Sequence, residues 1–174
     1  MSSKEIRANG SQRFVVPKRH QMKASSGVQV APDCLETYQS LKTQKQLKYI
    51  IFKITDDKKS IVLDKTGVDD KSLDSVKKYE AFVNELPQND CRLAVYDFDY
   101  ILEDDATKTQ GQRNKIVFFF WAPDDGASIK AKMLYASSKD ALRKTLVGAG
   151  PDVQGNDLAG VAYESVLDKI MRSK

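Results

Sequence analysis

Histidine, cysteine and glycine-rich loops are scarce in this chain, and their scarcity excludes most common kinds of catalytic site. The one histidine, His20, lies in the N-terminal tail, so the rest of the chain cannot form a Ser–His or Cys–His pair. Cys34 and Cys91 have no Cys or His neighbours at metal-binding spacing. Gly148 and Gly150 lack the remaining residues of a nucleotide-binding loop. We therefore expect a protein that is not an enzyme and that has no catalytic residue, metal or cofactor.

Long apolar runs are also missing. The longest, residues 116–122, is far shorter than the roughly 20 residues that cross a bilayer, and the N-terminus has no apolar stretch of the signal-peptide type. Two cysteines make at most one disulfide, which favours free thiols in a reducing cytosol. The 174 residues are 41% hydrophobic and 30% charged, which is typical of one globular domain that buries its own core.

The net charge of +4 is concentrated at the N-terminus. Residues 1–24 carry six cations against one acid, which gives +5, so residues 25–174 carry −1. The six cations are Lys4, Arg7, Arg13, Lys18, Arg19 and Lys23. A nearly neutral body does not predict nucleic-acid binding. We expect residues 1–24 to form a disordered basic extension and residues 25–174 to form one domain.

Acidic residues cluster at three places, residues 56–57, 69–70 and 103–105. Each cluster lies in a polar stretch, where solvated turns are more common than an acid–base pair. A hydrolase that uses Asp or Glu is therefore the weaker alternative, and it would need a deep pocket around a carboxyl group of raised pKa.

Hydrophobic spacing predicts alternating strands and helices. We expect helices over residues 33–44, 72–86, 127–147 and 163–172, and strands over residues 48–54, 60–63, 91–102 and 115–122, with a short edge strand near Val153. Asp33 should cap the first helix, Asp124 should open the third, and Pro87 should end the second. These elements predict a mixed sheet covered by helices on both faces.

The strands at 91–102 and 115–122 should pair as a projecting hairpin. One side of the first strand is apolar throughout, whereas the other turns acidic at Asp97 and Asp99, as expected of a strand that leaves the sheet centre. The second strand is apolar at nearly every position and should be central. Residues 103–114 are polar, so the tip should lie in water.

The long helix at 127–147 separates into faces when residues are placed every 100°. The core side should hold Ala131, Leu134, Tyr135, Ala141, Leu142 and Leu146. Lys132, Lys139 and Arg143 fall on the opposite side, and Ile129, Met133 and Ala136 fall on an exposed arc. This arc is either a solvated basic face with an incidental apolar residue or an interface that inserts Met133 into an apolar cleft of an acidic partner.

The last helix has the same two-sided pattern. Tyr163, Val166, Leu167 and Ile170 should be buried, and Asp168, Lys169 and Arg172 should be exposed.

Several strings resemble the actin-depolymerising factor/cofilin family over residues 26–172. They are Ser26-Gly27-Val28, LPQNDCRLAVYDFDY (86–100), RNKIVFFFWAPD (113–124), KAKMLYASSKDALRK (130–144), and DVQGND (152–157) ahead of ESVLDKIMR. The resemblance implies the actin-depolymerising-factor homology fold, an α/β (α+β) domain whose central mixed sheet of five to six strands is sandwiched by helices.

The resemblance also implies two actin-binding surfaces. The surface for monomers and filaments would comprise Ser26, Gly27, Val28, Lys130, Lys132, Met133, Lys139, Asp140, Arg143, Lys144 and Asp157. The surface for filaments only would comprise Arg113, Lys115, Asp168, Lys169 and Arg172. A monomeric protein that prefers ADP-actin and that severs and depolymerises filaments is implied, as is a place in the cytoplasm and cortical cytoskeleton. The basic string at residues 17–20 is a weak nuclear signal. A filament-side binder of the same fold without severing activity (coactosin-like) is the alternative, against which Met133 and the Ser-Gly-Val start both argue.

Regulation is implied as well. Phosphorylation of Ser26 by a kinase, reversed by a phosphatase, would block actin binding, and phosphoinositides would compete for Lys130, Lys132, Lys139, Arg143 and Lys144. Cyclase-associated protein is a further implied partner.

The chain departs from the family pattern at its start. Ser26 follows some two dozen extra residues, and the string from Met22 looks like a normal family start, so Met22 is a candidate initiator. The tail is otherwise a targeting or added segment, because its Arg-rich, acid-poor composition resembles an organelle presequence. Asp168-Lys169 keep the family's acid-then-base order with a shorter acid and a non-planar base, which would weaken the filament surface.

Overall fold

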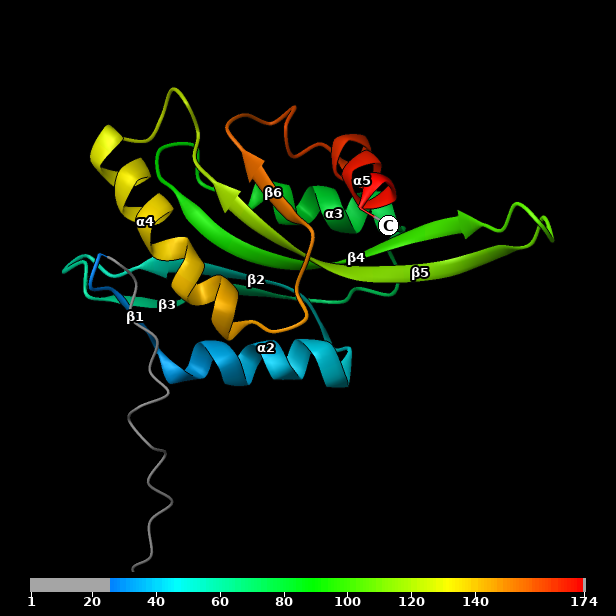
Figure 1. The fold of residues 1–174 in the computed structure, drawn as a ribbon, viewed down its shortest axis with the longest axis horizontal. Coiled ribbons are helices and arrows are strands. Elements are labelled where there is room, and N and C mark those ends of the chain that lie inside the picture. The colour runs from blue at the N-terminus through cyan, green and yellow to red at the C-terminus, as the bar shows by residue number, and fades with distance from the viewer. Residues whose placement is uncertain (1–25, 174) are drawn as a thin grey trace, which may run out of the picture.

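A six-stranded mixed sheet lies at the centre of the computed structural model, which describes residues 26–173 (Figure 1). The strand order is β1-β3-β2-β4-β5-β6, with parallel pairs at the two edges and antiparallel pairs between them. The strands are β1 (Gln29–Val30), β2 (Leu47–Ile54), β3 (Ser60–Val68), β4 (Arg92–Glu103), β5 (Gln110–Trp121) and β6 (Asp152–Gly155). The expected mixed sheet is confirmed, including the edge strand near Val153. The extension expected at residues 1–24 lies outside the described residues.

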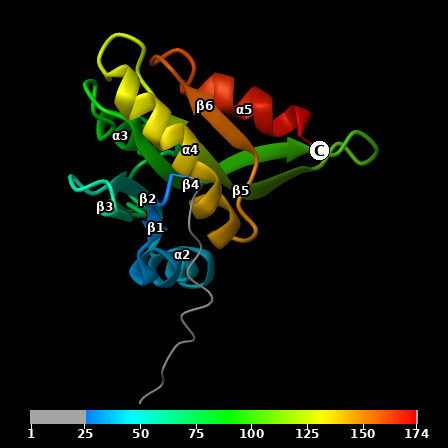
Figure 2. The ribbon, with the colours of Figure 1, turned by 60° about the vertical axis from the view of Figure 1, so that its left-hand side comes forward.

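Four helices cover the two faces of the sheet (Figures 1 and 2). They are α2 (Pro32–Gln44), α3 (Ser75–Asn84), α4 (Ile129–Thr145) and α5 (Tyr163–Arg172). Helices α2 and α4 pack on one face through a core that includes Tyr38 and Leu142, and α3 and α5 pack on the other through Phe82 and Ile170. Strand β4 serves both cores, because successive side chains of a strand point to opposite faces.

Several helix ends differ from the expectation. Ala31 rather than Asp33 is the N-cap of α2, because Pro32 occupies the first helical position, where its fixed φ and missing N–H are tolerated. Helix α3 begins three residues later than expected, at the point where Asp74 accepts a hydrogen bond from Lys77 N (2.8 Å). Helix α4 begins two residues later than expected, at Ile129, and its N-cap is Ser128 rather than Asp124.

The buried side of α2 holds a cysteine. Cys34, Tyr38 and Leu41 are fully buried, whereas the neighbouring Leu35 is 38% exposed. The first turn of α2 is therefore anchored in the core by Cys34 and not by the leucine beside it.

Strands β4 and β5 project beyond the rest of the sheet as a long hairpin, as expected (Figure 1). Their pairing continues to Glu103 and Gln110, so part of the segment expected as a loop is strand. Backbone pairing extends the strands there, and the hydrophobicity of residues 110–114 does not reveal it. Strand β3 likewise runs to Val68 rather than to Leu63, because it pairs with β2 along its length.

The acidic side of β4 is less solvated than its sequence suggests. Asp97 is 5% exposed and accepts hydrogen bonds from Asn114 Nδ2 (2.7 Å) and Lys45 Nζ (3.4 Å). Lys48, 3% exposed, reaches Asp99 Oδ2 at 2.5 Å. Partners from β2, β5 and the end of α2 therefore allow these carboxylates to be partly buried, since a buried charge is tolerated only when it is paired.

Candidate functional site

Helix α4 lies against the sheet with one long side buried and the other exposed. Ser128 caps the helix by accepting a hydrogen bond from Ala131 N (3.1 Å). On the buried side, Tyr135 OH accepts a hydrogen bond from Ile54 N (2.9 Å), which ties the helix to the end of β2. Leu142 is fully buried. The core side predicted from the spacing is confirmed, and it fixes which residues α4 presents outward.

The exposed side of α4 combines apolar and charged residues. Met133 is 66% exposed and Ile129 is 75% exposed. Lys130, Asp140 and Lys144 are exposed on the same side. We call these five residues the Met133 stripe. A flexible thioether beside cations suits insertion into an apolar cleft with an acidic border.

The three cations expected opposite the core lie instead at the border between α4 and the sheet. Lys132 Nζ donates to Asp124 O (2.9 Å), and Lys139 Nζ lies 5.4 Å from the ring centroid of Phe120. Arg143 Nε donates to Asp152 Oδ1 (2.7 Å). All three cations are half-buried. The position expected for them was wrong because β5, β6 and the loop that follows β5 lie beside α4 and supply partners on that side.

The Ser-Gly-Val string lies beside α4. Ser26 is exposed, and its Oγ lies 2.8 Å from Oγ of Ser138 on the helix. Gly27 adopts φ 84°, a left-handed conformation that favours glycine. Val28 is fully buried in the core, so its side chain has no surface to offer a partner and instead anchors the two residues before it.

Ser138 is a residue that the sequence reasoning missed. It is fully buried, and its hydroxyl donates to Leu134 O (2.6 Å) one turn earlier. The sequence does contain a sign of this role, because position 138 falls on the apolar side of the helix and yet holds a serine. A polar residue there requires a nearby partner.

Asp157 is exposed on the loop between β6 and α5, where its Oδ1 accepts a hydrogen bond from Gly160 N (2.8 Å). The same loop presents Leu158, 57% exposed. Both residues line a hollow of about 510 Å³ that is shared with Pro123 and Asp124 ahead of α4. The structure thus places Asp157 near the start of α4, and it adds Leu158 as an exposed apolar neighbour that the sequence reasoning did not single out.

The residues expected to contact filaments lie on the other side of the sheet, on β5 and α5. Lys115 Nζ is 3.5 Å from Oγ of Ser173, which directly follows α5. Asp168 and Arg172 form an ion pair of 3.0 Å one turn apart. Together with Lys169 they border a hollow of about 460 Å³. Arg113 is exposed two residues before Lys115.

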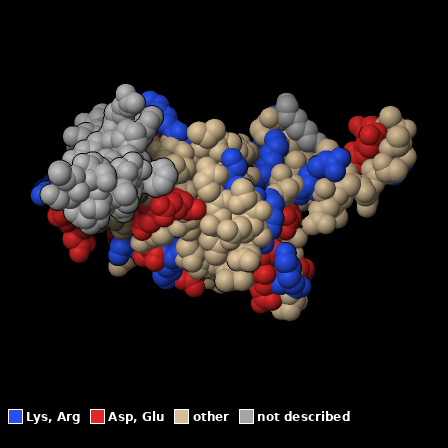
Figure 3. Space-filling model, turned by 90° about the horizontal axis from the view of Figure 1, so that it is seen from below, with Lys and Arg blue, Asp and Glu red and all other residues tan. Residues whose placement is uncertain are grey.

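Charge is unevenly distributed over the folded part of the chain. The residues of the expected monomer surface sum to +3, from five cations minus two acids: Lys130, Lys132, Lys139, Arg143 and Lys144, against Asp140 and Asp157. Because residues 25–174 sum to −1, all others in that range sum to −4. Figure 3 shows cationic side chains along the projecting hairpin and acidic ones at its tip. A partner that meets the α4 side therefore encounters a positive patch on a negative body.

Residues 27–171 match the sequence model of a family described as cofilin/tropomyosin-type actin-binding protein. This chain belongs to that family. It is 51% identical over 148 residues to the cofilin of Ogataea parapolymorpha, which covers 85% of this chain and 95% of the relative.

Solved structures agree with the family. The cofilin from Streptomyces griseoflavus superimposes with a TM-score of 0.70 at 45% identity, covering 84% of this chain and 98% of that one. Human coactosin-like protein shares the fold with a TM-score of 0.64 at only 13% identity, covering 84% of this chain and 90% of that one. Sequence identity therefore favours the cofilin branch over the coactosin-like alternative.

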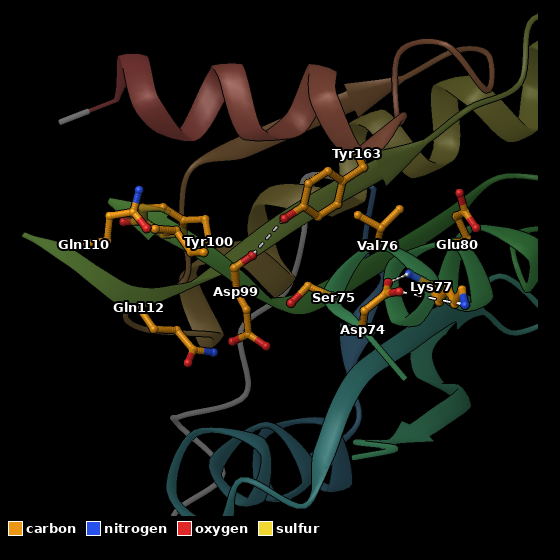
Figure 4. A pocket seen from close by; sticks show the side chains of 11 residues that line it. Asp74, Ser75, Val76, Lys77, Glu80, Asp99, Tyr100, Gln110, Gln112 and Tyr163 are labelled. Carbon is orange, nitrogen blue, oxygen red and sulfur yellow. Dashed lines mark hydrogen bonds and ion pairs between the residues drawn. The ribbon is translucent and has the colours of Figure 1, made fainter. Parts of the chain in front are cut away.

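A hollow of about 770 Å³ lies on the α3 side of this cofilin-family fold, between the start of α3 and the projecting hairpin (Figure 4). Three carboxylates line it. Asp74 caps α3, Asp99 is paired with Lys48, and Glu80 is exposed. Tyr163 OH donates to the backbone oxygen of Asp99 (3.2 Å). Two of the three acids are thus engaged in local structure, which gives the hydrolase alternative little support.

The cysteines of this cofilin-family chain are free and buried. Burial raises the pKa of the Cys34 thiol to about 12, with Asp33 adding to the effect, and raises that of Cys91 to about 11. Across residues 26–173, no three His, Cys, Asp or Glu side chains form a group that could hold a metal ion. Within the same range, no helix has the length and apolarity needed to cross a bilayer.

Proposed function

We propose that this protein binds monomeric and filamentous actin, prefers ADP-actin, and severs and depolymerises filaments. The observation that carries the proposal is Met133, which is 66% exposed on the capped, 17-residue helix α4 with Lys130 and Lys144 on the same side. Membership of an actin-binding family supports the identity of the partner.

Two surfaces explain how one small domain can act on a filament. The Met133 stripe and the β5–α5 residues lie on different faces of the sheet, so one molecule can contact two neighbouring actin subunits. A ligand that fits a twisted arrangement of subunits better than the relaxed one shifts the filament toward the twisted state. Strain at the boundary between decorated and bare stretches would then break lateral contacts, with no chemical step.

Co-sedimentation and microscopy test this proposal together. Pelleted and soluble actin are measured over a range of protein concentrations, and filament length is measured on the same samples. We expect binding to pelleted filaments, a rise in soluble actin and shorter filaments. Binding with unchanged filament length at saturation would favour the coactosin-like alternative, and an absence of binding would overturn the proposal.

We also propose that phosphoinositide headgroups compete for the α4 cations, since anionic lipids attract clustered Lys and Arg. The test uses phosphatidylcholine vesicles with and without a phosphoinositide. Replacing Lys132, Lys139 and Arg143 by Ala should abolish binding, and starting the chain at Met22 should leave it intact. The opposite pattern would assign lipid binding to the tail.

A phosphate on Ser26 would add about −1.5 to −2 charge at the α4 surface and weaken actin binding. We therefore include a regulatory kinase and a phosphatase among the proposed partners. Cyclase-associated protein is a further proposed partner, and we propose that the protein is monomeric. We place the protein at the cortical actin cytoskeleton, with the nucleus as a second site.

Residues 25–174 are the proposed functional domain. Comparing the actin affinity of the full chain with that of a chain starting at Met22 tests whether residues 1–24 obstruct the Ser26 region. A higher affinity of the shorter chain would mean that they do.

A further inference from the structure

Two serine hydroxyls that are 112 positions apart meet where the described chain begins. Ser26 is exposed and lies just ahead of β1, whereas Ser138 is fully buried on α4. Their Oγ atoms are 2.8 Å apart, which is a normal length for a hydrogen bond between hydroxyls. The exposed serine is therefore linked directly to the inner side of the helix that carries Met133.

The direction of this hydrogen bond follows from the number of protons available. A serine hydroxyl has one hydrogen to donate. Ser138 Oγ donates its hydrogen to Leu134 O at 2.6 Å, since a carbonyl oxygen can only accept. In the bond between the two serines, Ser26 must therefore be the donor and Ser138 the acceptor.

Within residues 26–173, this bond holds a segment that has few other attachments, one of which is local, because Val28 N donates to Ser26 Oγ (3.5 Å). Strand β1 has only two residues and is joined to β3 by hydrogen bonds from Gln29 N to Lys59 O (2.9 Å) and from Ala31 N to Ile61 O (3.0 Å). Ahead of β1, the side chain of Val28 is buried in the core. The bond from Ser26 to Ser138 then fixes the first described residue against α4.

We propose that Ser138 is a positioning residue for actin binding, which holds Ser26 on α4, and that phosphorylation of Ser26 acts partly by breaking this bond. The inference rests on the function proposed above for the α4 surface. In the modification, a kinase transfers the terminal phosphoryl group of a nucleoside triphosphate to Ser26 Oγ. The bond to the departing diphosphate breaks as the new O–P bond forms, and the hydroxyl proton is released.

The chemistry of phosphoserine explains why the hydrogen bond from Ser26 to Ser138 is lost. The ester oxygen at Ser26 has no hydrogen, so it cannot donate to Ser138 Oγ. The ionised phosphate oxygens are acceptors only. While Ser138 keeps donating to Leu134 O, phosphorylation therefore removes the hydrogen bond from Ser26 to Ser138, in addition to placing negative charge beside α4.

A double-mutant cycle on monomer binding tests the positioning role. Ser26→Ala, Ser138→Ala and the double variant are compared with the unmodified chain for affinity to fluorescently labelled ADP-actin monomers. We expect about a three- to tenfold loss for each single variant, the range of one hydrogen bond, and no further loss in the double variant. Equal affinity of Ser138→Ala and the unmodified chain, or losses that multiply in the double variant, would overturn the inference.

Two further variants separate positioning from a general effect on the fold. Thr145→Ala removes another hydroxyl of α4, one that donates to Ala141 O (2.9 Å), and should leave affinity unchanged. Ser138→Thr keeps the hydroxyl and should retain affinity. Ser26 is exposed, so Ser26→Ala breaks the same bond without disturbing the core even if a variant at position 138 is less stable. Amide hydrogen exchange at Val28 and Gln29 should accelerate in both Ala variants.

The phosphorylated protein provides the decisive comparison. Phosphoserine is incorporated at position 26 in the unmodified chain and in the Ser138→Ala background. We expect the phosphate to weaken actin binding by a smaller factor in the Ser138→Ala background, because the bond that it breaks is already absent there. The same factor in both backgrounds would mean that the phosphate acts by charge alone. Failure of the unmodified chain to bind actin would instead contradict the proposed function, so the two failures are distinguishable.

Discussion

Met133 is two-thirds exposed on a helix whose other side is buried, so its contribution to binding can be separated from its contribution to stability. We expect Met133→Ala to weaken actin binding about tenfold or more, because an inserted apolar side chain is a typical energetic centre of an interface. The free energy of unfolding of the Met133→Ala variant should differ from that of the unmodified chain by less than about 0.5 kcal/mol, as for substitutions at other exposed positions.

The matched control for Met133 is Leu142→Ala on the buried side of the same helix. It should cost about 2–5 kcal/mol of stability, because it leaves a cavity in a packed core. Urea unfolding and co-sedimentation measure both effects. A Met133 variant that unfolds early, or that binds actin normally, would contradict the role assigned to this side chain.

The buried cysteines should make the folded protein less stable at alkaline pH. The pKa of Cys34 rises from 9.0 to about 12 and that of Cys91 from 9.0 to about 11, chiefly because burial disfavours the thiolate. Below the unfolded-state pKa both states keep the thiol proton, and above it only the unfolded chain releases it. We therefore expect the free energy of unfolding to fall from about pH 9, the unfolded-state pKa, up to about pH 11, where the folded-state thiol of Cys91 begins to ionise as well.

Urea midpoints across that range check the expectation. Cys34→Ala should make the urea midpoint fall less steeply with pH. A midpoint of the unmodified chain that stays constant with pH would contradict the expectation. Both thiols should also react with a disulfide reagent only after unfolding, because the thiolate is the nucleophile.

At the scale of elements, two helix caps offer a comparison between structure and binding. Ser128 caps α4, which carries the Met133 stripe, and Asp74 caps α3, which carries none of the proposed contacts. Replacing either by Ala should cost about 0.5–2 kcal/mol of stability. Only Ser128→Ala should also weaken actin binding, because it loosens the turn that holds Lys130 and Met133. Thermal unfolding and monomer affinity measure the two effects, and equal losses of binding in both variants would contradict this reading.

The elements themselves were largely predictable. Helix α5 has the bounds that were expected, and the exposed position of Met133 on α4 follows from a spacing near 3.6 residues. Helix starts were less predictable, since Pro32, Asp74 and Ser128 act through local backbone geometry. The polar half of β5 could not be read from hydrophobicity, because cross-strand pairing with β4 maintains it.

At the scale of the whole molecule, the sheet separates the two proposed actin-binding surfaces. Replacing Lys169 and Arg172 together by Ala should weaken filament binding about tenfold and leave monomer binding unchanged. Stability should hardly change, because the ion pair of Arg172 with Asp168 is exposed. Co-sedimentation and monomer titration measure the two affinities. The matched control replaces Lys58 and Lys59, in the turn between β2 and β3, by Ala and should alter neither affinity. If the Lys169 and Arg172 variant lost monomer affinity and filament affinity by the same factor, the existence of two separate surfaces would be contradicted.

The sequence by itself determined the order of elements, the buried side of α4 and the exposure of Met133, because periodicity and turn chemistry act over a few neighbouring residues. Only the tertiary structure decided that Lys132, Lys139 and Arg143 lie against the sheet border, that Asp97 is buried, and that Ser26 bonds to Ser138. The partners in these contacts lie eight or more positions apart, and the bond between the serines spans 112. Such contacts depend on how the sheet brings distant segments together, which no local pattern of residues encodes.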